Sequence, residues 1–180
     1  MAGPSLLMSA APDGRALRIT VKELGDFSRE LRRLRPGTRV FAEGPYGNFT
    51  AARQTRRRAL LIAGGIGITP LRSLIETLPT GWGDLTLLYR VQRPEDFVFR
   101  DELDRLVRDR GIVVHPIAGV DIGDDETDRL GLPALRRLVP DVADRDVYLC
   151  GPPALVDALH RRLRHLGVPR RHIHSERFAY

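Results

Sequence analysis

The chain has 180 residues, of which 42% are hydrophobic, and its formal net charge at pH 7 is +6. This length and apolar content suffice for one buried core and part of a second, which excludes a disordered tail. The sequence has no run of about 18 or more apolar residues and no basic segment before an apolar one at its start, so a soluble, cytoplasmic protein is expected.

Cysteine and arginine usage narrow the function classes further. Cys150 is the single cysteine, which excludes an internal disulfide and a cysteine-based metal site within this chain. The histidines show no spacing typical of metal ligands, so no metal is expected. Lys22 is the only lysine, so arginine carries nearly all the positive charge. The arginines lack the interleaved aromatic residues that stack bases, which favours solvated helix faces and anionic ligands over nucleic acid.

Residues 5–50 are predicted to be rich in β-structure. The stretches SLLMSA and ALRITVK flank APDG, a pattern typical of a hairpin with an Asp-Gly turn. Leu17, Ile19 and Val21 alternate with polar residues, as expected for a strand that buries one face.

A short helix and a further strand are predicted next. Asp26 can cap a helix in GDFSRELRRLRPG that ends at Pro36 and Gly37. TRVFAEGPYGNF follows as another strand that runs into a Gly-Pro turn. The polar, basic residues 51–58 are interpreted as a linker, because the composition changes after them.

From residue 59 onward, apolar stretches alternate with amphipathic runs of about ten residues. The predicted strands are ALLIAG, DLTLLYR, GIVVHPIAG, DVYLCG and RHIHSERF, and the helices between them lie at about 70–78, 100–110, 131–138 and 153–166. This alternation favours an α/β fold with a five-stranded, doubly wound parallel sheet. We expect this domain at 59–180, preceded by part of an antiparallel β-barrel at 1–50.

The stretch LLIAGGIGITPLRSLIE predicts a strand, a phosphate-binding turn and a helix. Gly64, Gly65 and Gly67 can adopt positive φ and allow a backbone or a ligand to approach closely. Pro70 fits the first turn of a helix, where its missing N–H is no loss. Such a turn can also be an ordinary tight loop. CGPP follows the fourth predicted strand, however, and we expect both loops to lie together where a dinucleotide pyrophosphate binds.

The loop after the second strand carries charges that bear on nucleotide choice. Arg90 and Arg93 are expected at the same rim of the sheet, where arginine favours the 2′-phosphate of NADP and an acidic residue favours the free hydroxyl of NAD. Glu95 and Asp96 follow closely, so the predicted preference is weak. Both arginines are alternatively solvated charges at the end of a strand.

The motifs GGIGITP, CGPPALV and ERFAY together resemble the NAD(P)-binding domain of the ferredoxin–NADP reductase superfamily. The resemblance is strongest to bacterial oxygenase reductases and ferric-reductase-like proteins. Upstream, GDFS and GPYGNF are similar to a turn and to the barrel-to-domain junction of the superfamily's flavin-binding barrel. These motifs cover about residues 9–180 in the family's order.

The resemblance implies roles for individual residues. Cys150 would lie close to the nicotinamide, and Glu176 would help to order the hydride-transfer site. Ser28 would hold the FAD pyrophosphate, and Phe178 would pack on the flavin ring. The other implied cofactor-binding residues are Gly44, Pro45, Gly47, Gly65, Gly67, Thr69, Pro70, Arg90, Arg93, Gly151 and Pro152. Cys150 as a buried small hydrophobe, and Phe178 as a core residue, remain open alternatives.

The function implied by the resemblance is that of an electron-transfer reductase. Hydride would pass from NADH or NADPH to FAD, and electrons would pass on to a haem, an iron–sulfur centre or another acceptor on a separate domain or chain. The acceptor would be soluble or bound at the cytoplasmic face of a membrane.

The sequence departs from the family at its start. Family members have a flavin-binding motif here that contains an arginine, an aromatic residue and a hydroxyl, whereas this chain has AGPSLLM. About three barrel strands that would precede this motif are absent from the sequence. The chain is therefore interpreted as a C-terminal piece whose exposed barrel strands would also favour self-association. The alternative function is an NAD(P)-binding or partner-binding fragment without stable flavin.

Overall fold

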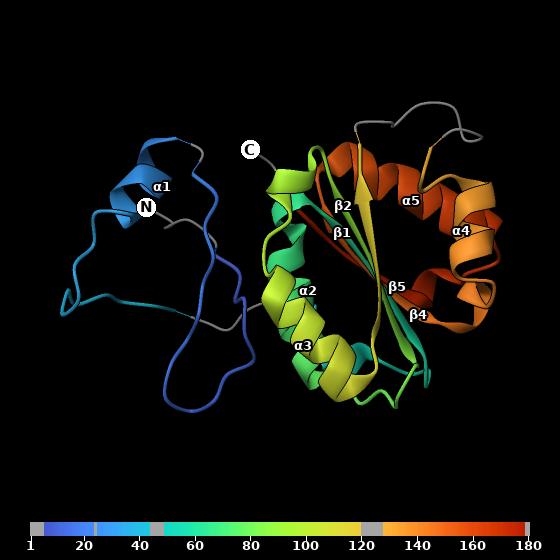
Figure 1. The fold of residues 1–180 in the computed structure, drawn as a ribbon, viewed down its shortest axis with the longest axis horizontal. Helices are drawn as coiled ribbons and strands as arrows, with labels where there is room; N and C mark the ends of the chain where they lie inside the picture. The colour runs from blue at the N-terminus through green and yellow to red at the C-terminus, as the bar shows by residue number, and fades with distance from the viewer. Residues whose placement is uncertain (1–5, 24, 44–48, 120–127, 179–180) are drawn as a thin grey trace.

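A parallel sheet of five strands forms the centre of the fold in this computed structural model (Figure 1). The structure describes residues 6–23, 25–43, 49–119 and 128–178. The strands are β1 (Ala59–Gly64), β2 (Leu85–Val91), β3 (Val113–Ala118), β4 (Asp146–Gly151) and β5 (Ile173–Arg177). Their order is β3-β2-β1-β4-β5, and every neighbouring pair is parallel. The predicted doubly wound α/β class is confirmed.

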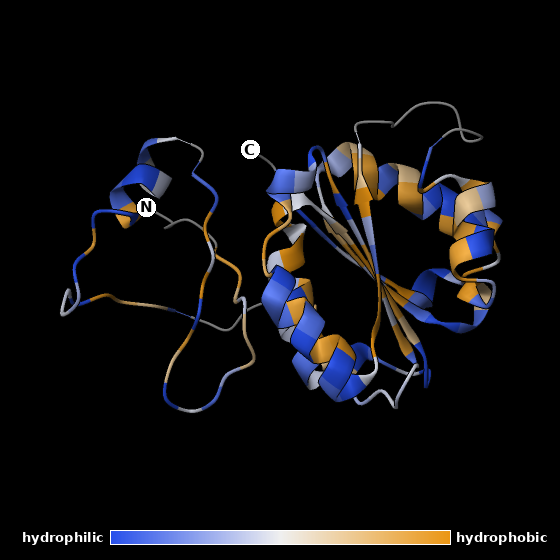
Figure 2. Cartoon of the chain, in the orientation of Figure 1, coloured by the Kyte–Doolittle hydropathy of each residue, from blue (hydrophilic) through white to orange (hydrophobic). Residues whose placement is uncertain are grey.

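Helices cover both faces of the sheet (Figure 1). They are α2 (Ile68–Thr77), α3 (Arg100–Arg110), α4 (Leu132–Leu138) and α5 (Pro153–His165). Successive side chains of a strand point to opposite faces. Leu61 of β1 therefore packs in one cluster with α2 and α3, whereas Leu60 and Ile62 pack in a second cluster with α4 and α5. The three central strands β1, β2 and β4 are buried at every residue because both faces of the sheet are covered, and Figure 2 shows much hydrophobic colour in the interior of the domain.

The predicted helices of this domain are all present, and only α2 differs visibly in its start. The glycine-rich turn winds as a 3-10 turn, η2 (Gly65–Gly67), which continues directly into α2 at Ile68. The helix thus begins before Pro70, which is buried in its first turn. Among the described residues, no helix is both long enough and apolar enough to span a bilayer.

The N-terminal segment forms the predicted hairpin turn. Met8 and Ile19 form an isolated antiparallel bridge. At the turn, the carboxylate of Asp13 accepts hydrogen bonds of 2.8 Å from the N–H groups of Arg15 and Ala16. Gly14 has a φ of 77°, a conformation that favours glycine.

The predicted strands of this segment are not present in the described residues 6–23 and 25–43, where the structure has the helix α1 (Asp26–Leu31) and the single bridge. Leu17 and Ile19 are 65% and 43% exposed. A strand with a buried face needs a neighbouring strand and a covering core, and alternation alone supplies neither. The partial barrel at 1–50 and the domain boundaries at 50 and 58 stay predictions.

The predicted cap of α1 is wrong by one residue. Gly25, with a φ of 97°, is the N-cap, and Asp26 is the first helical residue. A glycine suits this positive φ, whereas aspartate would be strained there. Asp26 instead lies in the first turn and pairs with Arg29 at 3.1 Å.

An ion-pair network joins the N-terminal segment to the α/β domain. Arg18 donates to both carboxylate oxygens of Glu102 on α3, at 3.1 and 3.0 Å. Arg72 of α2 pairs with Glu102 at 2.8 Å and with Glu76 at 2.5 Å. The backbone N–H of Ala11 donates to Glu76 at 2.7 Å. The hairpin is therefore held on α2 and α3 by charge-assisted hydrogen bonds.

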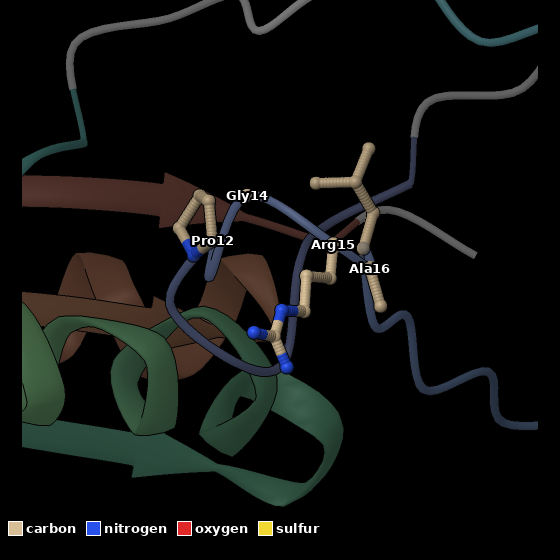
Figure 3. A pocket seen from close by; sticks show the side chains of 5 residues that line it. Pro12, Gly14, Arg15 and Ala16 are labelled. Atoms are coloured by element: carbon tan, nitrogen blue, oxygen red, sulfur yellow. The ribbon is translucent and has the colours of Figure 1, made fainter.

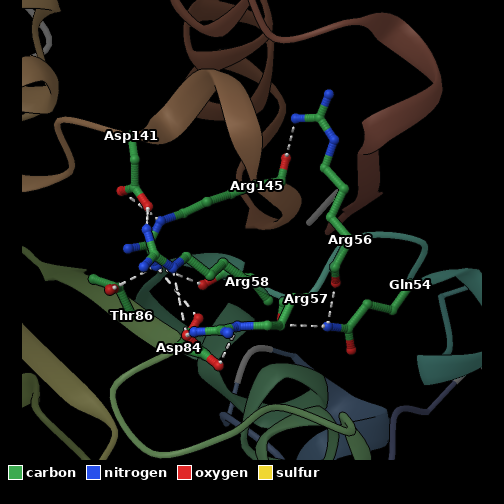
Figure 4. A network of polar contacts seen from close by, with 9 residues as sticks. Gln54, Arg56, Arg57, Arg58, Asp84, Thr86, Asp141 and Arg145 are labelled. Atoms are coloured by element: carbon green, nitrogen blue, oxygen red, sulfur yellow. Dashed lines mark hydrogen bonds and ion pairs between the residues drawn. The ribbon is translucent and has the colours of Figure 1, made fainter.

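Arginines also bind carboxylates at the amino-terminal ends of the strands (Figure 4). Asp84, just before β2, pairs with Arg57 at 3.0 Å and with Arg58 at 3.4 Å. The buried Arg145 donates to Thr86 Oγ1 at 3.1 Å and pairs with Asp141 at 2.8 Å. The contacts of Asp84 attach the last two residues of the linker to the start of β2.

Asp146 attaches the linker itself. Its fully buried carboxylate accepts hydrogen bonds of 2.6 Å from the N–H groups of both Thr55 and Arg56, and Nδ1 of His172 lies 2.9 Å away. Burial opposes ionisation, but these donors outweigh it and hold the pKa of Asp146 below its usual value. The ionised carboxylate is thus the form that stabilises the fold.

We predict that Asp146→Asn lowers the free energy of unfolding at pH 7 by about 2–4 kcal/mol, because buried donors lose a charged acceptor. The native pKa is depressed, so this stabilisation is complete above the unfolded value of about 3.9 and is lost as pH falls below it. Urea unfolding at pH 7 and pH 3 measures both effects, and the variant should lose less stability on acidification than the wild type. The exposed Asp144 supplies the control Asp144→Asn, and equal losses for the two variants would contradict the prediction.

Candidate functional site

The loops after β1 and β4 meet at the carboxyl-terminal edge of the sheet. Ala63 pairs with Cys150 in the parallel ladder. A Cβ added to Gly67 would lie 2.1 Å from the carbonyl oxygen of Cys150, and one added to Gly64 would lie 2.5 Å from Cδ2 of Leu155. Real Cβ atoms do not approach so closely, so glycine at these two positions allows the loops to touch. The predicted juxtaposition of GGIGITP and CGPP is confirmed.

Gly65 is a glycine for a different reason. Its φ is 55°, and a Cβ added there would meet no protein atom within 4 Å. The residue therefore needs glycine for its backbone conformation rather than for packing. It leaves bare backbone facing open space at the edge of the sheet, which is the geometry that a closely approaching ligand requires.

Two helices begin beside these loops. Neither α2 nor α5 has a side-chain hydrogen bond at its N-cap, so side chains do not satisfy the N–H groups of their first turns. Thr69 donates its hydroxyl to the carbonyl oxygen of Ile66 at 2.7 Å and is buried. Pro152 is the N-cap of α5. Backbone donors and two helix dipoles thus favour an anion here, and a pyrophosphate fits this donor set.

Cys150 ends β4 in the interior of the protein. It is 1% exposed and lies opposite Glu176 in the register of β4 and β5. Burial, together with the negative charge of Glu176, raises the pKa of the Cys150 thiol far above its usual value. The thiol is therefore protonated and serves as a small apolar group rather than a nucleophile.

Phe178 lies directly after β5 at the same edge. Its N–H donates to the carbonyl oxygen of Gly151 at 3.1 Å, and its half-buried ring packs against the α2 and α3 side of the core. Glu176 is also half-buried. The structure thus brings Cys150, Gly151, Glu176 and Phe178 together at the ends of two adjacent strands, although their roles with a cofactor stay predictions.

Arg90 and Arg93 differ in their surroundings. Arg90 is buried, and its Nη1 lies 3.4 Å from Oδ1 of Asp128, whose other oxygen pairs with Arg162 at 2.7 Å. This pairing gives Arg90 a buried acidic partner. Arg93 is 67% exposed and pairs with Asp96 at 3.1 Å. The expected contact of both arginines with a 2′-phosphate stays a prediction, and Arg93 is the more accessible of the two.

Of the other predicted flavin-binding residues, only Ser28 is among the described residues. Ser28 lies on α1, apart from the sheet (Figure 1), and its hydroxyl donates to the carbonyl oxygen of Gly25 at 2.9 Å. Gly44, Pro45 and Gly47 lie outside the described residues.

The sequence reasoning missed two residues near the site. Asp128 is buried between Arg90 and Arg162, although it belongs to an acidic stretch that reads as solvated. Phe99 has a φ of 61° at the N-cap of α3, and the guanidinium of Arg18 lies 5.4 Å from the centre of its ring. A buried arginine in a predicted strand is the signal that could have indicated a buried acidic partner.

A hollow of about 290 Å³ lies at the hairpin turn, away from the loops after β1 and β4 (Figure 3). Its lining residues are Pro12, Gly14, Arg15, Ala16 and Leu17. None of the predicted site residues lines it, so it does not belong to the site at the sheet edge.

Comparisons with known proteins agree with this geometry. Residues 61–161 match the family model described as an oxidoreductase NAD-binding domain. The chain is 34% identical to ferredoxin–NADP reductase B of Sorangium cellulosum, and the match covers 95% of this chain and 76% of that protein. It is 33% identical to the ferredoxin reductase component of a 3-ketosteroid-9-alpha-monooxygenase of Mycobacterium tuberculosis, with 91% of this chain but only 46% of that protein covered.

A solved structure shares the fold. The ferredoxin–NADP⁺ reductase from Plasmodium falciparum, determined with 2′P-AMP, is 18% identical with a TM-score of 0.73, and the match covers 96% of this chain and 75% of that one. The family match includes β1, the glycine-rich turn and β4. The chain therefore belongs to the family of oxidoreductase NAD-binding domains, within the ferredoxin–NADP reductase superfamily.

Proposed function

We propose that this chain binds NADH or NADPH across the β1–α2 and β4–α5 loops and passes hydride from it to FAD, as part of an electron-transfer reductase. The observation that carries the proposal is the contact between Gly67 and the carbonyl of Cys150, which sets two helix N-termini beside each other. The pyrophosphate would bind to backbone N–H groups there. The nicotinamide would extend toward Cys150, Glu176 and Phe178.

The residues around the nicotinamide position serve binding and orientation in this proposal. The buried, protonated thiol of Cys150 adds no charge beneath the nicotinamide position, and the carbonyl of Gly151 holds Phe178 in place. FAD, when bound, would supply the redox chemistry, because a flavin can accept one hydride, which carries two electrons, and release those electrons one at a time. Phe178 fits a flavin contact, whereas Ser28 has its hydroxyl engaged with Gly25.

We propose that the acceptor is a haem, an iron–sulfur centre or another redox group on a separate domain or chain. The name of the mycobacterial relative, a reductase component of a monooxygenase, supports an acceptor within an oxygenase system. A cytoplasmic location, including the cytoplasmic face of a membrane complex, is part of the same proposal.

A second candidate function is an NAD(P)-binding fragment without stable flavin. It is favoured by the N-terminal segment, where large apolar side chains are exposed, among them Leu17 at 65%, Val40 at 66% and Phe41 at 94%. Such exposed side chains enclose an isoalloxazine ring only if a further polypeptide segment packs over them.

We predict that Gly65→Ala weakens the binding of both NADPH and NADH at least tenfold, which is about 1.4 kcal/mol, because the added Cβ enters the space of the pyrophosphate. The control is Gly83→Ala. Gly83 also has a positive φ and no protein atom within 4 Å of an added Cβ, so its backbone strain is comparable. Calorimetric titration measures the affinities. Equal affinities of the two variants for the nucleotides would contradict nucleotide binding at the Gly65 loop.

Gly67→Val is expected to act through the fold rather than through ligand contact. Its side chain would meet the Cys150 carbonyl, and the loops could no longer touch. We predict a clear fall in the urea midpoint of unfolding together with loss of nucleotide binding. A variant that kept its stability but lost binding would show that the residue faces the ligand instead.

We predict that Arg93→Gln weakens NADPH binding about tenfold and leaves NADH binding nearly unchanged, because only NADPH carries the 2′-phosphate. The exposed Arg108 of α3 provides the control Arg108→Gln. If both nucleotides lose the same affinity, Arg93 does not read the phosphate, and NAD becomes the expected cofactor.

We predict that this chain purified by itself loses FAD on gel filtration and oxidises NADPH slowly with ferricyanide, because one bridge and exposed apolar side chains do not enclose a flavin. Absorbance near 450 nm, typical of bound flavin, reports retention. A yellow preparation with stoichiometric FAD and rapid turnover would contradict the prediction and would support the complete reductase function over the second candidate.

A further inference from the structure

A basic hollow lies at the amino-terminal end of β4 and β5, at the opposite end of the strands from the nucleotide loops. Its volume is about 530 Å³. Its lining residues are Ala52, Arg53, Thr55, Arg56, Arg171, His172 and His174. The residues come from the linker, from η5 (Arg170–His172) and from β5. Neither the nucleotide site nor the proposed flavin contact uses any of them.

The arginines of this hollow are not neutralised by acidic residues. Within the described parts of the chain, no carboxylate lies within ion-pair distance of Arg53, Arg56 or Arg171. Arg56 donates to the carbonyl oxygens of Ala143 and Arg145, which leaves its charge uncompensated. Arg57 and Arg58, the next residues of the linker, differ because both pair with Asp84.

The carboxylate beneath the hollow offsets only one of these three positive charges. Asp146 is fully buried, and its oxygens accept from the N–H groups of Thr55 and Arg56, from the Thr55 hydroxyl at 3.3 Å and from His172. Its single charge is already engaged in these bonds. The three guanidinium charges of the lining exceed it by two.

Two histidines form part of the wall. Nδ1 of His172 lies 2.9 Å from an oxygen of Asp146, and Nε of Arg171 donates to its Nε2 at 3.1 Å. Burial lowers the pKa of His174 and outweighs the opposing effect of Asp146, whose Oδ1 lies 3.5 Å from Nε2. The bond to His172 also orients Arg171, so its remaining N–H groups are preorganised.

We infer that this hollow binds a phosphate dianion, either as inorganic phosphate or as the terminal group of a small phosphomonoester, through Arg53 and Arg171. Two negative charges match the excess of two positive charges, and planar guanidinium groups match the oxygens of a phosphate. Because the hollow and the nucleotide loops lie at opposite ends of the parallel strands, the two ligands bind independently.

The test is calorimetric titration with inorganic phosphate and, separately, with phenyl phosphate, at constant ionic strength. We expect the double variant Arg53→Gln/Arg171→Gln to bind phosphate at least about tenfold more weakly than the wild type, because two charge-assisted contacts are lost. A control double variant, Arg108→Gln/Arg161→Gln, removes the same charge from exposed helix positions and should bind phosphate as the wild type does. Circular dichroism melting checks that both variants fold.

Two further arms make the result decisive. Gly65→Ala should leave phosphate binding unchanged, and the Arg53/Arg171 variant should keep its affinity for NADPH. Phosphate binding that is lost in Gly65→Ala but kept in the arginine variant would place the anion at the nucleotide loops and overturn the inference. Equal losses in both arginine variants, or no phosphate binding by the wild type, would overturn it as well.

The two ligands distinguish the free anion from a monoester. Binding of phosphate but not of phenyl phosphate would support the inference for the free anion, and binding of both would extend it to monoesters. A wild-type chain that bound phosphate but neither NADPH nor NADH would contradict the proposed function and not this site.

Discussion

The close approach of Gly67 to the carbonyl of Cys150 is the constraint on which the arrangement of the site depends. Parallel strands β1 and β4 are neighbours, but adjacency in a ladder does not by itself bring the loops after them into contact. The absence of a Cβ at Gly64 and Gly67 removes the last layer of atoms between them. The N-termini of α2 and α5 then lie at one edge, where their dipoles add. A methyl group at Gly67 would meet the backbone of Cys150 and separate the two loops.

Buried charge is concentrated at the ends of the strands. At the amino-terminal end, Asp84 and Asp146 bind the linker, whereas Asp128 pairs with Arg162 and with Arg90 near the carboxyl-terminal end of β2. Each of these acidic side chains has several donors, as a buried carboxylate requires. The arginine-rich composition is thus partly structural, because several arginines serve as donors to these buried carboxylates.

The sequence predicted the α/β domain well because its signals are local. Continuous apolar strands and amphipathic helices have a characteristic period, and a glycine-rich turn after a strand has few alternatives. The N-terminal segment was predicted less well. Leu17, Ile19 and Val21 have the alternation of a strand, but strand formation depends on a partner that the pattern does not describe. Ion pairs such as Arg90 with Asp128 join residues 38 positions apart, and no local pattern reports which charges will meet.

The same limit applied to the reason for each glycine. The sequence GGIG indicates that these positions do not accept a side chain, but it does not give the reason. Gly67 touches the protein's own backbone, whereas Gly65 faces open space. This distinction needs the neighbouring strand. It decides whether a substitution affects folding or ligand binding.

The burial of Cys150 has a practical consequence for the chemistry of the whole chain. It is the only cysteine, it is 1% exposed, and its thiol stays protonated. The thiolate is the form that reacts with maleimides, peroxides and disulfides. The folded protein therefore offers such reagents almost no native target, and a cysteine introduced on an exposed surface would be the one site that a fluorophore or a spin label modifies.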